Sequence, residues 1–173
     1  MTPALGIDIG RVIISAGSGR GDTSFLDGDL VSALRTPPAE AAFPSIAQLV
    51  GDVGGRVWLV SKAGPRVQDR TLRWLEHHRF WSETGVQRSR LRFCRQRAEK
   101  ADIARSLGLT HFVDDRVDVL AAMTGVVQFR FLFGPQRHPP TGHILVPDWR
   151  AALAAIRATF SAGSSDALAE RSR

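Results

Sequence analysis

The alternation of short strand-like segments with longer helix-like stretches is the feature that most constrains the fold of this chain. Segments with the length and character of buried strands lie at residues 4–8, 56–60, 91–94, 110–113 and 126–131. Helical patterns lie at about residues 38–50, from Pro65 onward, and at 97–107, 117–122 and 149–159. Strands that alternate with helices are typical of a parallel sheet covered by helices. The pattern therefore predicts an α/β fold with a five-stranded parallel sheet.

The chain length of 173 residues suits one domain with a sizeable core. We expect a single domain over residues 1–160. A loop rich in Gly, Ser and Asp follows the first strand and predicts a short flap at about residues 10–36. The small, polar segment 161–173 is expected to be a mobile tail. Because no connection is long enough for a large inserted cap, we also expect an open site.

Composition excludes several classes of protein. Cys94 is the single cysteine, which rules out an intramolecular disulfide framework. No apolar run approaches the ~20 residues of a membrane span, and the first residues lack the basic and apolar segments of a signal peptide. We therefore expect a cytoplasmic protein with no membrane partner, and the oligomeric state stays open.

The positive charge has two interpretations. The formal net charge is +6, and all basic residues except Lys62 and Lys100 are arginines. A nucleic-acid partner would explain this charge, and a basic pocket for a phosphorylated small molecule explains it equally well. The chain is also rich in Ala and Gly. Its preference for arginine over lysine therefore indicates a general bias in amino-acid usage as much as it indicates a function. We therefore expect the small molecule first and nucleic acid second.

Polar side chains follow three of the predicted strands where each strand ends: Asp8, Ser61 and the pair Asp114–Asp115. Ligands of parallel α/β sheets bind beyond the carboxyl ends of the strands, so these side chains should converge there. Three converging carboxylates repel one another unless a divalent cation is present, and oxygen ligands of this kind suit Mg²⁺. Lys100 supplies the cation expected opposite such a cluster. The sequence predicts a Mg²⁺-binding phosphate site lined by carboxylates.

These residues lie in four stretches that resemble the ordered motifs of the haloacid dehalogenase-like superfamily. The stretches are Leu5-Gly6-Ile7-Asp8-Ile9-Gly10-Arg11-Val12, Val57-Trp58-Leu59-Val60-Ser61, Lys100 and Thr110-His111-Phe112-Val113-Asp114-Asp115. The resemblance covers roughly residues 4–133. It implies a Rossmann-like three-layer sandwich without a large cap, and a Mg²⁺-dependent phosphohydrolase of phosphate esters.

The resemblance also implies a role for each matched residue. Asp8 would be the nucleophile that attacks phosphorus and forms an aspartyl-phosphate. Ser61 would hydrogen-bond a phosphoryl oxygen, and Lys100 would offset charge on Asp8 and on the transferring group. Asp8 and Asp114 would hold Mg²⁺, directly or through water, while Asp115 would steady the metal's waters or Lys100.

One position departs from the family pattern. Phosphatases of the superfamily usually carry a second aspartate two positions after the nucleophile, as general acid and base, and this chain has Gly10 there. The backbone carbonyl of Gly10 would still suit the metal, but general acid–base catalysis is typically worth about 10²–10⁴ in rate. Three outcomes stay open: a slow phosphatase for good leaving groups, a site that only binds, or an enzyme whose acid comes from the flap residues Asp22, Asp27 or Asp29.

Cationic residues beside the motifs are the candidates for contacts to a substrate phosphate: Arg11, Lys62, Arg66 and Arg116. The densest basic patch lies elsewhere and comprises Arg88, Arg90, Arg92, Arg95 and Arg97. Its first three members alternate, so we expect them to share one face of a strand. In the resembled fold this strand lies at the sheet edge, where charges discourage unwanted pairing. A contact to a nucleic-acid backbone is the alternative interpretation.

Each site residue also has a structural interpretation. Asp8 alone is consistent with a turn residue, and Lys100 alone with a solvated surface lysine. Ser61 and one member of the Asp114–Asp115 pair precede helices and suit N-caps. The second hypothesis is therefore a catalytically silent module of the same fold that binds a phosphorylated ligand, nucleic acid or a protein partner.

Overall fold

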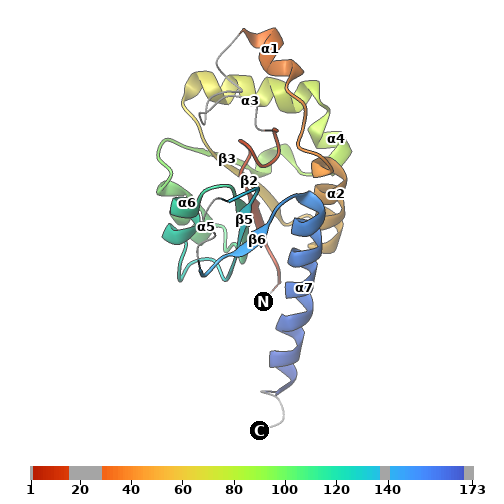
Figure 1. Ribbon diagram of the computed structural model, residues 1–173, viewed down its shortest axis with the longest axis vertical. Helices are drawn as coiled ribbons and strands as arrows, with labels where there is room; N and C mark the ends of the chain where they lie inside the picture. Colours follow the sequence, from red (N-terminus) through yellow and green to blue (C-terminus); the bar gives the residue numbers. More distant parts are fainter. Residues whose placement is uncertain (1, 16–28, 137–140, 170–173) are drawn as a thin grey trace.

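A parallel sheet lies at the centre of the molecule, seen in a computed structural model that describes residues 2–15, 29–136 and 141–169 (Figure 1). Its strands in these residues are β1 (Leu5–Ile7), β2 (Val57–Lys62), β3 (Leu91–Cys94), β4 (His111–Asp114), β5 (Phe129–Phe133) and β6 (Ile144–Val146). The order across the sheet is β3-β2-β1-β4-β5-β6, and all neighbours are parallel. β1 therefore lies in the interior of the sheet, between β2 and β4.

Helices cover both faces of this sheet. They are α1 (Leu30–Arg35), α2 (Ala42–Asp52), α3 (Pro65–His77), α4 (Phe80–Thr84), α5 (Glu99–Ser106), α6 (Val117–Ala122) and α7 (Trp149–Ala169), with a short 3₁₀ helix at Arg88–Arg90. α5 and α6 lie on one side of the sheet, and α2 and α7 lie on the other (Figure 1). The three layers confirm the predicted α/β sandwich.

The residues of β2 show why its sequence is an unbroken apolar run. Val57 and Leu59 pack into the core cluster that contains α2 and α7, whereas Trp58 and Val60 pack into the cluster that contains α5 and α6. Successive side chains of a strand point to opposite faces of the sheet. Because helices cover both faces, both sets of side chains are buried and both are apolar.

The sheet has a sixth strand, β6, so the predicted count of five strands was one too low. β6 pairs in parallel with β5, with Phe131 opposite Ile144 and Phe133 opposite Val146. A three-residue segment among prolines has too little periodicity to separate a strand from a loop. Pairing with β5, a tertiary contact, makes this segment a strand.

The region of the predicted flap contains regular structure. α1 lies inside it, and α2 begins at Ala42 rather than at Pro38. Pro38 instead forms an antiparallel bridge with Ile14, which joins the two ends of the flap. The middle of the flap, residues 16–28, lies outside the described residues.

α7 is longer than the sequence pattern predicts. It begins at Trp149, as expected, but continues past Thr159 to Ala169. Most of the segment predicted as a tail is therefore helical, and residues 170–173 lie outside the described part. Neither α7 nor any other described helix combines the length and the hydrophobicity that a membrane crossing needs.

Candidate active site

The candidate site begins where β1 ends. Asp8 is the first residue after the strand, and its backbone N–H donates to the carbonyl of Val113 at 3.0 Å, which holds this end of β1 against β4. The chain then turns sharply, because the N–H groups of Ile13 and Ile14 both donate to the carbonyl of Ile9 at 3.0 Å. The turn leaves the Asp8 side chain at the carboxyl edge of the sheet, where ligands of such sheets bind.

A residue of α7 supports this turn. The indole Nε1 of Trp149 donates a buried hydrogen bond of 2.7 Å to the carbonyl of Val12, 137 positions earlier in the sequence. The Trp149 side chain is fully buried. The position of the loop that follows Asp8 therefore depends on the last helix of the chain.

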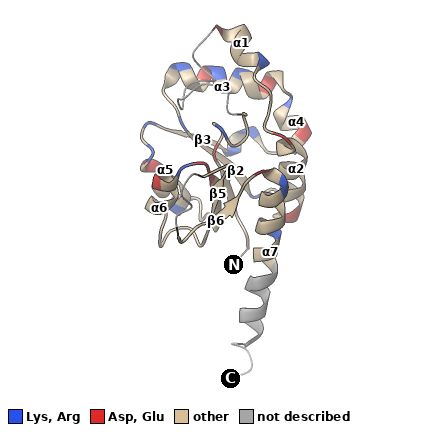
Figure 2. Ribbon diagram, viewed as in Figure 1, with Lys and Arg blue, Asp and Glu red and all other residues tan. Residues whose placement is uncertain are grey.

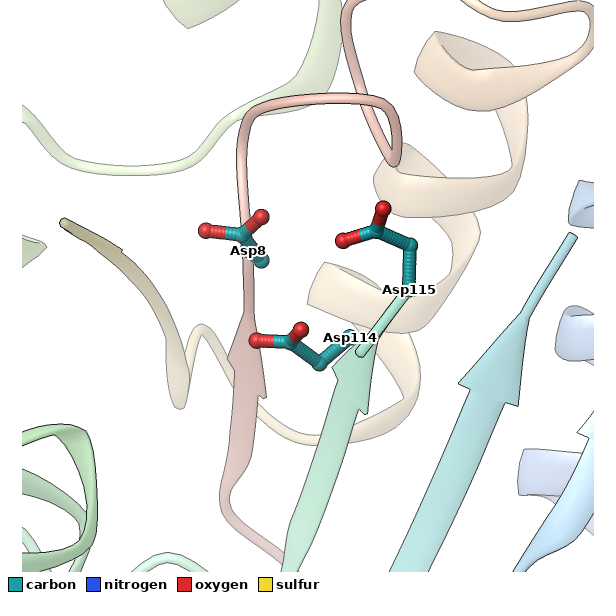
Figure 3. Close-up of side chains that lie close together, drawn as sticks. All are labelled: Asp8, Asp114 and Asp115. Carbon is teal, nitrogen blue, oxygen red and sulfur yellow. The ribbon is translucent and has the colours of Figure 1, made fainter. Parts of the chain in front are cut away.

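Three carboxylates from two neighbouring strands lie close together (Figure 3). Asp8 follows β1, Asp114 is the last residue of β4, and Asp115 comes next. One oxygen of each carboxylate lies within 4.8 Å of the others. Asp114 is completely buried and Asp8 is 7% exposed. Adjacent parallel strands thus bring together the three acidic residues that the sequence analysis assigned to a metal.

A buried lysine joins two of these carboxylates. The Nζ of Lys100 donates to Oδ1 of Asp8 at 2.7 Å and to Oδ2 of Asp114 at 2.8 Å. Burial by itself would lower the pKa of Lys100, but the Asp8 and Asp114 carboxylates outweigh burial and raise its pKa above the ordinary value. Lys100 is therefore held as a cation between the nucleophile candidate and a metal-ligand candidate.

The carboxylates carry more negative charge than Lys100 offsets. Burial raises the pKa of Asp114, and the Asp8 carboxylate raises it further. Burial likewise raises the pKa of Asp115 to about 6, and Asp8 again adds to the shift. Both shifts reflect the unfavourable energy of anions that share a desolvated site, which a divalent cation would relieve. Asp8, Asp114 and Asp115 therefore fit a site for Mg²⁺, which prefers oxygen ligands.

Gly10 and Arg11 form the turn beside these carboxylates. A Cβ added to Gly10 would meet no atom of the described residues within 4 Å. Arg11 has a left-handed backbone with φ of 62°, which is unusual for a residue with a long side chain. Its Nε lies 3.3 Å from Oδ2 of Asp115, so this strained residue holds one of the metal-ligand candidates.

A pocket of about 110 Å³ opens beside Asp8, which is room for several water molecules. Its polar lining comprises Asp8, Arg11, Ser15, Ser61, Lys62, Thr71, Arg97, Lys100, Asp115 and Arg116. Ser61 is the next-to-last residue of β2, the strand beside β1. Its hydroxyl therefore shares one small pocket with the Asp8 carboxylate.

Of the four cations predicted to bind substrate, Arg11, Lys62 and Arg116 line the pocket. The backbone N–H of Arg116 also donates to Oδ1 of Asp114 at 3.0 Å, and its guanidinium pairs with Asp118. Arg66 is exposed in the first turn of α3 and is not among the residues that line the pocket. The role of Arg66 stays a prediction.

Arg97 and Thr71 also line the pocket, and the sequence analysis assigned neither to the site. The carbonyl of Arg97 accepts the N–H of Lys100 at 3.1 Å, so one turn places both residues at the start of α5. The three-residue spacing between Arg97 and Lys100 is the sequence signal that could have identified Arg97 as a site residue. Thr71 has no such signal, because its place depends on how α3 packs.

Other arginines of the basic patch make contacts within the fold. Arg88–Arg90 form a 3₁₀ helix, so the prediction that Arg88, Arg90 and Arg92 share one strand face was wrong. Arg88 pairs with Glu76, and the Arg90 guanidinium lies 4.3 Å from the ring centre of Trp58. β3 lies at the sheet edge, as expected. α3, which pairs with the patch through Glu76, carries acidic as well as basic segments (Figure 2). Because acidic residues lie beside the arginines, the structure favours the interpretation that the patch serves the fold rather than a nucleic acid.

Of the three flap aspartates considered as a replacement acid, Asp29 lies in the described residues. Its carboxylate accepts a hydrogen bond of 2.7 Å from the N–H of Ser32 and caps α1. This bond to the Ser32 backbone lowers the pKa of Asp29, which favours the anion and makes Asp29 a poor proton donor. Asp22 and Asp27 lie outside the described residues.

Replacement of Lys100 by Met is expected to lower the free energy of unfolding by about 3 kcal/mol in EDTA, because two buried carboxylates lose their cation. Added Mg²⁺ should recover more stability in the variant than it adds to the native chain, since the metal would take over the missing positive charge. Urea unfolding with and without Mg²⁺ measures both effects.

The other lysine of the chain provides the matched control. Lys62 is exposed, so Lys62→Met is expected to change the free energy of unfolding by less than about 0.5 kcal/mol. Equal losses in the two variants would contradict the assignment of Lys100 as the cation that balances Asp8 and Asp114.

Comparison with known proteins shows what this chain is similar to. Its sequence matches no protein-family model and no curated protein. The structure is similar to D,D-heptose 1,7-bisphosphate phosphatase from B. bronchiseptica, complexed with magnesium and phosphate, with a TM-score of 0.64 and 12% identity over 91% of this chain and 99% of that one. It is also similar to a haloacid dehalogenase-like family hydrolase from Xanthomonas campestris, with a TM-score of 0.57 and 12% identity over 90% and 95%. The chain therefore has the fold of the haloacid dehalogenase-like hydrolases, as its four motifs predict.

Proposed function

We propose that this protein is a Mg²⁺-dependent phosphohydrolase that cleaves phosphate esters through an aspartyl-phosphate on Asp8. One observation carries the proposal: the Asp8 carboxylate accepts a hydrogen bond from buried Lys100 and lies within 4.8 Å of Asp114 and Asp115. A phosphoryl group there would meet a nucleophile, a cation and metal ligands together. The similar phosphatase structure complexed with magnesium and phosphate supports the same chemistry.

The first step would form the aspartyl-phosphate. A carboxylate oxygen of Asp8 attacks phosphorus while the bond to the leaving oxygen breaks, which replaces one difficult displacement by two easier ones. Lys100 would donate its hydrogen bond to Asp8 before the attack and would stabilise negative charge on the transferring group. Ser61 would donate its hydroxyl to a phosphoryl oxygen.

The second step would release phosphate. Water attacks the phosphorus of the aspartyl-phosphate, and Asp8 departs as a carboxylate that Lys100 again stabilises. Gly10 supplies neither an acid for the first step nor a base for the second. We therefore expect turnover about 10²–10⁴ slower than a site with a positioned acid and base would give.

The metal ligands would be Asp8, Asp114 and Asp115, with the carbonyl of Gly10 as a further candidate. Bound Mg²⁺ would neutralise charge on the phosphoryl oxygens and orient the phosphate. Arg11 holds Asp115 through an ion pair, and the N–H of Arg116 holds Asp114. Contacts of this kind orient metal ligands. These two arginines would therefore contribute to Mg²⁺ binding even if neither touches the substrate.

Phosphate release from a panel of phosphate esters tests this function. We expect release that requires Mg²⁺, stops in EDTA and returns when Mg²⁺ is restored. Mg²⁺ with beryllium fluoride, which imitates an aspartyl-phosphate, should raise the melting temperature of the native chain but not of Asp8→Asn. No release from any ester, while calorimetry shows that Mg²⁺ binds, would contradict the proposal and favour the silent binding module.

A further inference from the structure

The hydrogen bond from Trp149 to the carbonyl of Val12 holds the turn that follows Asp8. The bond measures 2.7 Å, and the Trp149 and Val12 side chains are both completely buried. A buried carbonyl that loses its donor must find another one or move toward water, because an unpaired polar group in the core is unfavourable. The conformation of this turn therefore depends on the indole N–H.

The same turn contains a residue with an unfavourable backbone conformation. Arg11, directly before Val12, is left-handed with φ of 62°. A residue other than glycine keeps such a conformation where surrounding contacts enforce it. The bond from Trp149 is one of these contacts, since it fixes the carbonyl of the residue that follows Arg11.

Arg11 connects the turn to the carboxylates of the site. Its Nε lies 3.3 Å from Oδ2 of Asp115. One oxygen of Asp115 in turn lies within 4.8 Å of oxygens of Asp8 and Asp114. If the turn relaxed, the Arg11 side chain would move and Asp115 would lose this contact. Contacts to metal ligands from outside set the ligand geometry, and metal affinity depends on them.

The indole is itself firmly placed. Trp149 is the first residue of α7, and the Asp148 carboxylate before it accepts the N–H of Ala151 at 2.9 Å, which caps the helix. The Trp149 ring also packs against Phe133 of β5, with ring centres 5.6 Å apart. A donor held by a capped helix and a strand can keep the turn in one position.

We propose that Trp149 is a positioning residue of the Mg²⁺ site: its indole N–H holds the Val12 carbonyl, and the turn thereby keeps Arg11 against Asp115. The inference rests on the metal site of the proposed function. Trp149 does not line the pocket beside Asp8, so it acts without touching metal or substrate. The last helix of the chain therefore contributes to metal affinity at the end of the first strand.

Trp149→Phe is the first test, because phenylalanine keeps an aromatic ring in the core but has no N–H. We expect the Kd for Mg²⁺, measured by calorimetry without substrate, to rise about 10-fold, the low end of what outer contacts of metal ligands contribute. An unchanged Kd in the folded variant would overturn the inference.

Trp74→Phe is the matched control. The Trp74 side chain is also completely buried, and its Nε1 donates to the carbonyl of Thr36 at 2.8 Å. Thr36 does not line the pocket beside Asp8. Both variants should lower the melting temperature by a similar amount, on the order of 5 °C, but Trp74→Phe should leave the Kd for Mg²⁺ within about twofold of native. An equal rise in Kd in both variants would overturn the inference, because it would follow from a general loss of stability.

Benzothienylalanine in place of Trp149 keeps the test valid if Trp149→Phe does not fold. Its sulfur replaces the indole N–H in a ring of nearly the same shape, so the core stays filled while the donor is lost. We again expect the Kd for Mg²⁺ to rise about 10-fold. A native Kd in this variant would overturn the inference even if Trp149→Phe binds Mg²⁺ poorly, because that loss would come from packing.

The binding measurement also separates this inference from the proposed function. A chain that hydrolyses no ester, but whose Mg²⁺ affinity depends on the Trp149 N–H, would remove the phosphohydrolase and support the positioning role. A chain with Asp8-dependent hydrolysis, but with a Mg²⁺ affinity that is insensitive to Trp149, would keep the proposed function and overturn only this inference.

Discussion

Asp8→Asn is expected to lower Mg²⁺-dependent phosphate release by at least about 10³-fold on every ester that the native chain hydrolyses. An amide is a poor nucleophile because its lone pair is delocalised, so the aspartyl-phosphate cannot form. Asparagine has nearly the shape of aspartate, and its carbonyl oxygen would still accept the hydrogen bond from Lys100. The loss should therefore report the chemistry rather than a collapse of the site.

Three measurements make this result decisive. Steady-state phosphate release gives the rate, acid-quenched intact mass shows whether a phosphoryl group stays on the protein, and thermal melting verifies the fold. Asp69→Asn is the matched control, because Asp69 is an exposed carboxylate on α3 that pairs with Arg73, and its rate should stay within about twofold of native. Full turnover in Asp8→Asn would contradict the aspartyl-phosphate mechanism.

Gly10→Asp is expected to raise kcat for benzyl phosphate by about 10²-fold, at the low end of what general acid catalysis supplies. The described turn has room for the side chain and a backbone conformation that an aspartate accepts. Negative charge on nearby Asp8 should raise the pKa of the new carboxyl group, which favours the protonated form that a general acid needs. The gain should be smaller for phenyl phosphate, whose leaving oxygen needs no proton.

Gly10→Asn separates acid catalysis from a change of shape. Asparagine fills the same space but has no titratable proton, so we expect no gain in kcat on either ester. The ratio of kcat for the benzyl and phenyl esters is the measurement, in native protein and in both variants. Equal gains from Asp and Asn would show that the side chain acts by packing, and would contradict the assignment of Gly10 as the site of the missing acid.

The strand-end residues were predictable because their positions follow from local pattern and chain direction. A buried strand followed at once by an acidic residue, as at Asp8 and at Asp114–Asp115, places that residue at the carboxyl edge of a parallel sheet. The wrong predictions have a different origin. The alternation of Arg88, Arg90 and Arg92 suggested a strand, but the contacts of Arg88 with Glu76 and of Arg90 with Trp58 accompany a 3₁₀ turn instead.

The sequence by itself therefore determined the fold class, the motif order and the residues that meet at the edge of the sheet, since these depend on periodicity and on the polarity of neighbouring residues. The tertiary structure alone decided how the site is supported. The contact of Trp149 with the loop after β1 and the place of Thr71 in the pocket join residues far apart in the chain. No local pattern encodes such contacts, because they form only when separate elements pack against one another.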